Sequence, residues 1–117
     1  MNTYLLLLHE TVEESGQSSP DEIQATIAEY SAWYESLKRA DRVVDSGKLT
    51  DEGGRRIEGS GESFRVLDGP YAEGKEVVGG YFVIRAQDYD DAVAQSRSCP
   101  HVKYGWIEIR QIDVLSA

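Results

Sequence analysis

The order of strand and helix patterns is the feature that most limits what this chain can fold into. Aromatic and leucine residues run from Tyr4 to His9, which predicts a first strand with apolar side chains on both faces. A helix should follow, because the segment from Ser19 to Glu22 has capping-box spacing with Pro20 at the first helical position. Apolar residues then recur at steps of three and four until about residue 40, which predicts one buried helix face. They are Ile23, Ile27, Tyr30, Tyr34 and Leu37.

The middle of the chain predicts short strands separated by glycines. A short strand near residues 42–44 should end at Ser46-Gly47, and a turn should follow over residues 51–54. Two further strands near residues 55–58 and 63–67 predict a hairpin joined by three small residues.

The last third repeats the strand-helix-strand order. A β-branched and aromatic run over residues 79–84 predicts a strand, and Asp88 is placed to cap a helix that stops at Cys99-Pro100. The final strand is expected from Tyr104 to Ile112. Its two-residue period should turn Ile107 and Ile109 to one face, and Trp106, Glu108, Arg110 and Ile112 to the other.

This order predicts an α+β class fold of the ferredoxin-like βαββαβ type with an antiparallel sheet. Both helices cover one face of the sheet in that architecture. The opposite face, with Trp106, would then be an exposed apolar surface. We therefore expect a homodimer through that face, of the dimeric α+β barrel type, with a cavity between the sheets.

Length and charge limit the class of protein further. The 117 residues suit a single domain over residues 1–117. The net charge of −9 disfavours direct binding to nucleic acid or to anionic membranes. The longest aliphatic run, Leu5 to Leu8, is too short to span a membrane, and no signal-peptide pattern precedes it, so we expect a cytoplasmic protein. The single cysteine, Cys99, should be a half-buried structural residue at a helix end.

The segment from Asp68 to Glu76 holds the densest group of functional side chains. It can be a solvated turn, or a fold-defining connection in which Glu73 and Lys75 pair with each other. It can also be the lip of a pocket, with Asp68 as a general base or orienting carboxylate and Lys75 as an anion anchor.

This segment resembles the DGPFAETKE signature of the YCII-related family. Seven positions match it, whereas Tyr71 replaces Phe and Gly74 replaces Thr. Similarity continues through Tyr4 to Leu8, Gly79 to Ile84, Cys99-Pro100 and the start of the last strand. The resemblance implies a dimeric, ferredoxin-like α+β domain, in agreement with the periodicity.

The resemblance implies more than one function. Some family branches hold a His and an Asp in a dimer pocket, and one relative is a cofactor-free dehydrochlorinase of a chlorinated hydroxyhydroquinone. Other relatives are joined to, or found beside, sigma factors. The His of the first group lies in the first helix, where this chain has Tyr30, so that dyad is not expected here in the same form.

Two histidines and one charged pair are the remaining candidates for residues of a functional site. His9 ends the first strand and can reach a pocket rim as an acid or base, whereas His101 follows Pro100 in a loop and is expected to be exposed. Glu108 and Arg110 share a strand face, so they can form an ion pair or bind a carboxylate ligand through Arg110. No metal-ligand spacing or nucleotide-binding motif occurs, so we expect neither a metal nor a cofactor.

Two functions follow from these residues. The first is a cofactor-independent small enzyme of the lyase or isomerase type, acting on a small acid or phenol. Asp68 and His9 would be its acid and base, and the ligand contacts would be Tyr71, Glu73, Lys75 and Arg110. The alternative is a non-catalytic ligand-binding or regulatory module, linked to sigma-factor-type transcription regulation.

Overall fold

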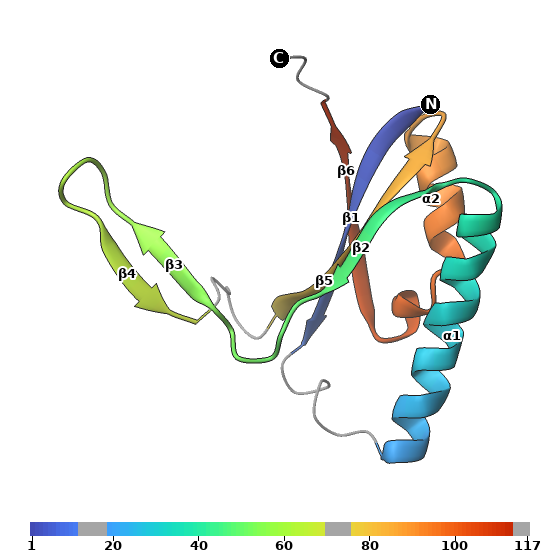
Figure 1. Cartoon of the computed structure of the whole chain (residues 1–117), viewed down its shortest axis with the longest axis horizontal. Coiled ribbons are helices and arrows are strands. Elements are labelled where there is room, and N and C mark those ends of the chain that lie inside the picture. Colours follow the sequence, from blue (N-terminus) through green and yellow to red (C-terminus); the bar gives the residue numbers. More distant parts are fainter. Residues whose placement is uncertain (12–18, 70–75, 114–117) are drawn as a thin grey trace.

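The computed structural model has a sheet covered by helices on one side, with a hairpin projecting from it (Figure 1). It describes residues 1–11, 19–69 and 76–113. The main sheet contains β1 (Asn2–Thr11), β2 (Val43–Lys48), β5 (Glu76–Ala86) and β6 (Gly105–Ile112). The helices are α1 (Pro20–Arg39), α2 (Tyr89–Arg97) and the short 3₁₀ helix η1 (Pro100–Lys103). A separate two-stranded sheet contains β3 (Arg55–Glu58) and β4 (Arg65–Asp68).

The topology confirms the predicted fold class. The strand order in the main sheet is β2-β5-β1-β6, and each neighbouring pair is antiparallel. The first and last strands of the chain therefore lie side by side, as in a ferredoxin-like fold. The predicted hairpin also forms, with Ile57 paired to Val66 across it.

Both helices begin where the sequence predicts. The Ser19 hydroxyl accepts a hydrogen bond from the Glu22 amide at 3.2 Å, and the Asp88 carboxylate accepts one from the Asp91 amide at 2.8 Å. These caps satisfy amides that a helix cannot pair internally. The carboxylate of Asp91 in turn accepts from Arg42 Nη1 at 2.7 Å, so α2 is tied to the start of β2.

The hydrophobic core lies between the main sheet and the helices. The Trp33 ring meets Phe82 edge-on, with the ring centres 4.9 Å apart, and its Nε1 donates to the Gln95 carbonyl at 3.1 Å. Burial of the large ring therefore leaves no unpaired donor. The other buried members are Tyr4, Leu6, Leu37, Ile84, Ala86, Ala92 and Cys99.

The predicted buried face of α1 is wrong for the first half of the helix. Leu37 is buried, but Ile23 and Ile27 are exposed. In Figure 1 the first turns of α1 extend past the end of the strands. A helical period shows where a stripe lies on a helix, but it does not show how far the sheet beneath it reaches.

Two smaller expectations also need correction. Gly47 lies inside β2 instead of ending a strand. A glycine is needed at this position of the strand, because the Tyr81 ring packs directly over it and leaves no room for a Cβ atom. Cys99 is fully buried instead of half-buried, and burial raises the pKa of its thiol. No helix among the described residues has the length and apolar character that a membrane span requires.

Candidate functional site

One face of the main sheet has no helix on it in the described part of the chain, and we call it the open face (Figure 1). The buried residues Tyr4 and Leu6 point toward the helices. Strand alternation therefore turns their neighbours the other way. The open face comprises Thr3, Leu5, Leu7 and His9 of β1, Tyr81, Val83 and Arg85 of β5, and Trp106, Glu108, Arg110 and Ile112 of β6.

A polar row crosses this mostly apolar surface. The His9 ring stacks on the Trp106 indole, with ring centres 3.9 Å apart and planes 2° apart. His9 Nε2 lies 3.0 Å from Glu108 Oε1. The second carboxylate oxygen of Glu108 accepts from Arg110 Nη1 at 3.4 Å. An imidazole, a carboxylate and a guanidinium are thus connected on one surface.

Strand register produces this arrangement. His9 lies directly across from Trp106, and Glu108 and Arg110 follow at the two-residue period of β6. The register of β1 against β5 shifts between Leu8 and His9. Gly105 begins β6 under the His9 carbonyl, where any Cβ atom would collide with that oxygen. The sequence predicted the Glu108–Arg110 pair, which is confirmed, but it did not predict that Glu108 also binds His9.

The charge on Glu108 is stabilised by its neighbours. The hydrogen bond from His9 is the main cause that lowers the pKa of this carboxyl group, and Arg110 adds to it. Glu108 is therefore a carboxylate at neutral pH and accepts the proton of His9 Nε2. This fixes the tautomer of a neutral His9, whose Nδ1 then carries the lone pair. No described residue hydrogen-bonds to that Nδ1.

His101 is buried, so the expectation of an exposed loop histidine is wrong. Only 3% of its surface is exposed, because η1 folds the loop against α1. Its Nε2–H donates to the His9 carbonyl at 2.7 Å, and its Nδ1 accepts from the Tyr30 hydroxyl at 2.7 Å. Burial raises the pKa of that hydroxyl above its ordinary value. Tyr30 and His101 thus hold the backbone of His9 from the helix side of the sheet.

A hollow of about 300 Å³ lies beside this row. Trp106 forms part of its wall and is also the stacking partner of His9. An aromatic or aliphatic group bound there would contact the Trp106 ring, on which His9 stacks. The other lining residues are Glu10, Thr11, Val102, Lys103, Tyr104 and Gly105.

Comparison with known families agrees with this fold. The model of the YCII-related domain matches residues 3–116, which is nearly the whole chain. The chain belongs to the YCII-related family. Among curated proteins, no sequence matches this YCII-related chain.

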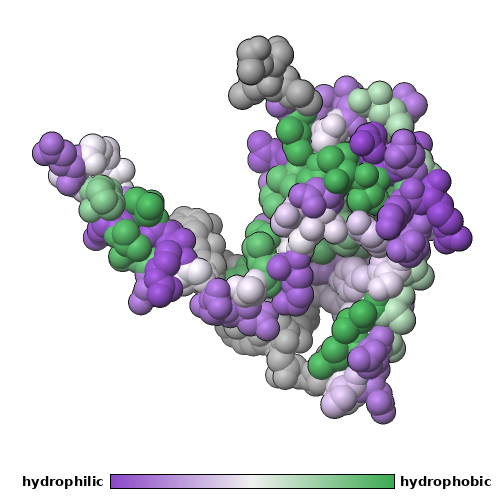
Figure 2. Space-filling view, in the orientation of Figure 1, coloured by the Kyte–Doolittle hydropathy of each residue, from purple (hydrophilic) through white to green (hydrophobic). Residues whose placement is uncertain are grey.

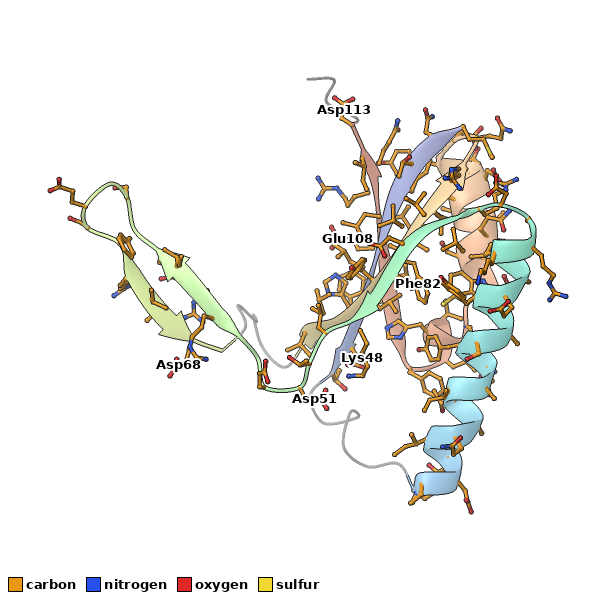
Figure 3. The ribbon with its side chains drawn as sticks, viewed as in Figure 1. Lys48, Asp51, Asp68, Phe82, Glu108 and Asp113 are labelled. Carbon is orange, nitrogen blue, oxygen red and sulfur yellow. The ribbon has the colours of Figure 1, made fainter. Side chains whose placement is uncertain are left out.

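The candidate residues between Asp68 and Glu76 of this YCII-related chain lie away from His9 or outside the described residues. Asp68 ends β4 on the projecting hairpin, where its carboxylate pairs with Arg55 Nε at 3.2 Å and its side chain is 90% exposed. Figure 3 shows Asp68 on the hairpin and Glu108 on the main sheet, well separated. Within one chain, Asp68 and His9 are therefore not brought together. Tyr71, Glu73 and Lys75 lie outside the described residues.

The described residues do not form a metal site. No group of three or more His, Cys, Asp or Glu side chains within residues 1–11, 19–69 and 76–113 could hold a metal ion. The chemistry available on the open face of this YCII-related chain is that of an imidazole with a paired carboxylate and guanidinium.

Proposed function

We propose that this YCII-related chain is a cofactor-independent enzyme of the lyase or isomerase type, acting on a small acid or phenol. The observation that carries the proposal is the 3.0 Å contact between His9 Nε2 and Glu108 Oε1. A carboxylate on one ring nitrogen leaves the other nitrogen basic and stabilises the imidazolium that forms when it takes a proton.

The proposed step is a proton transfer by His9. Its Nδ1 accepts a proton from the bound substrate, and the ring becomes a positively charged imidazolium. The Nε2–H group remains hydrogen-bonded to the Glu108 carboxylate. The proton then returns to the substrate at another atom, or serves to protonate a leaving group. Arg110, whose side chain is 68% exposed, is available to bind a substrate carboxylate or phenolate.

The proposal includes a second copy of the chain seated on the open face. Leu5, Leu7 and Val83 are only half-buried there, and Trp106 is exposed. An apolar surface of this kind favours an interface, and a second sheet would shield the His9–Glu108 pair from water. Shielding strengthens the attraction between an imidazolium and a carboxylate.

A second candidate is a non-catalytic ligand-binding or regulatory module, of the kind linked to sigma-factor-type regulation. The position of Asp68 favours it, because this signature carboxylate is exposed and occupied by Arg55. In that case the open face binds a ligand or a second copy without chemistry.

The test begins with a thermal-shift screen of small carboxylic acids and phenols. A compound that binds the folded chain raises its melting temperature. Each compound that binds is then incubated with the protein in deuterium oxide, and exchange of its carbon-bound hydrogen is followed by NMR. We expect His9→Gln to retain binding and to lower the exchange rate by about 100-fold or more.

The two carboxylates provide the matched comparison. Glu108→Gln is expected to lower the exchange rate more than Asp68→Asn does, because only Glu108 contacts His9. Binding without exchange in the wild type would transfer support to the non-catalytic module. Equal exchange by wild type and His9→Gln would contradict the role of His9.

A further inference from the structure

The hairpin of β3 and β4, with its turn, forms an arm that stands apart from the main sheet. We define the arm as residues 55–68. Its strands are only four residues long, and they form their own two-stranded sheet. A two-stranded hairpin of this length is marginally stable in water unless something packs against it. A surface that packs against the arm would therefore stabilise it.

One side of the arm is apolar and uncovered in the described structure. Ile57 and Val66 face each other across the strands, and Ile57 is 70% exposed. Phe64, just before β4, is exposed as well. Figure 2 shows hydrophobic residues gathered on the arm, outside the body of the molecule. The pairing also places Arg55 and Asp68 on the same side as Ile57 and Val66.

The arm projects on the side of the main sheet opposite to α1 and α2 (Figure 1). This is the side of the open face. A second copy seated on the open face would therefore lie beside the arm, whereas a partner on the helix side would be out of its reach.

Size and charge support a second copy of this chain as the occupant. The radius of gyration is 16.2 Å, compared with about 13 Å for a compact domain of this length. The exposed surface is 8379 Å², about 2000 Å² above the expectation for a compact monomer, and a standard interface needs about 800 Å² from each partner.

The arm has three arginines and three acidic residues, whereas the whole chain has a net charge of −9. Two such chains repel each other least where the arm makes the contact.

We propose that the arm of each chain clasps a second copy of the chain, with the side formed by Ile57, Phe64 and Val66 packed on it. This inference rests on the dimer of the proposed function and extends it, because the dimer needs only the open face. In the clasp, the Arg55–Asp68 ion pair lies in the contact between copies. The Asp68 carboxylate thereby contributes to the contact between copies as well as to the hairpin of its own chain.

The test measures contacts between copies directly. Glu62→Cys at the exposed turn of the arm is combined with Cys99→Ala, labelled with a nitroxide, and mixed with isotope-labelled wild type. Paramagnetic line broadening in the isotope-labelled chain then arises only from the other copy. We expect broadening of amides in the body of that chain, and none with a diamagnetic label.

A second measurement tests the apolar side. The double variant Ile57→Ser, Val66→Ser is expected to raise the dissociation constant of self-association about tenfold or more, as loss of an interface anchor does. Leu67→Ser, on the other side of the arm, is the matched control and should change it less.

The outcomes separate the two proposals. A chain that light scattering finds monomeric would overturn both the dimer and the clasp. A dimer without paramagnetic broadening would overturn the clasp and leave the dimer of the proposed function standing. Equal effects of the double variant and of Leu67→Ser would also contradict the clasp.

Discussion

The two faces of the main sheet differ in how far their apolar side chains are buried and their polar groups hydrogen-bonded within the chain. On the helix side, Leu6 and Ile84 are completely buried, and the polar groups of Trp33 and His101 have hydrogen-bond partners inside the chain. On the open face, Leu7 remains half-buried and Trp106 exposed. The same strands supply both faces, so the difference comes from what covers them and not from strand propensity.

This contrast separates the packing that stabilises the fold from the surface on which the proposed function depends. Packing on the helix side is completed within one chain and stabilises the fold. The open face combines incomplete packing with a connected imidazole, carboxylate and guanidinium. An exposed apolar surface around such linked groups is typical of a binding site. Substitutions that affect one face and spare the other can therefore test the contrast.

Leu6→Ala and Leu7→Ala form the strongest test, because these neighbours in β1 face opposite sides. Leu6 is fully buried, so its truncation should lower the free energy of unfolding by about 2–5 kcal/mol through lost burial and a cavity. Leu7→Ala should cost less in dilute solution. Its cost should rise with protein concentration if a second copy covers the open face. Denaturant unfolding at two protein concentrations measures both losses in the free energy of unfolding. Equal losses for the two variants at both concentrations would contradict the difference between the two faces.

Tyr30→Phe tests the connection between the two faces. It removes the donor to His101 Nδ1 and leaves a buried acceptor unpaired, at an expected cost of about 1–2 kcal/mol in the free energy of unfolding. Tyr34→Phe in the same helix is the control, because the Tyr34 hydroxyl has no hydrogen bond to a described residue. A smaller effect for Tyr30→Phe than for the control would contradict the buried link to His9.

Acid pH should produce the smallest effect, on the helix side. Hydrogen bonds from the Gln87 amide and Arg42 lower the pKa of Asp91 from 3.8 to about 2. A lowered folded-state pKa stabilises the fold above the unfolded-state value, and this stabilisation is lost as the pH falls from 3.8 to about 2. Asp91→Asn should therefore make stability less dependent on pH in that range. Asp90→Asn is the matched control, because it makes the same charge change in the same helical turn and leaves the bonds of Asp91 to Gln87 and Arg42 in place.

Local patterns predicted much of the fold, and nonlocal contacts account for what they missed. Capping by Ser19 and Asp88 depends on residues three positions away, so the helix starts could be predicted from sequence. The exposure of Ile23 and the burial of His101 could not, because both depend on where the sheet ends and on how η1 packs against α1.

The candidate site divides in the same way. The two-residue period of the last strand was enough to predict Glu108 and Arg110 on one face, and they do lie together there. The partnership of His9 with Glu108 joins residues 99 positions apart, and it requires one particular register between the first and last strands. The ferredoxin-like order makes those strands neighbours, but it does not set their register.

The element order, the helix caps, the hairpin and the resemblance to the family can all be read from the amino-acid sequence, because each of these depends on residues close together in the chain. The contacts around three residues required the folded molecule: those of His9 with Glu108 and Trp106, of Tyr30 with His101, and of Asp68 with Arg55 on the arm. The first two depend on strand register and on helix packing, which join distant parts of the chain. The place of the third, on an arm away from the main sheet, depends on which surfaces the packing of the whole chain leaves uncovered.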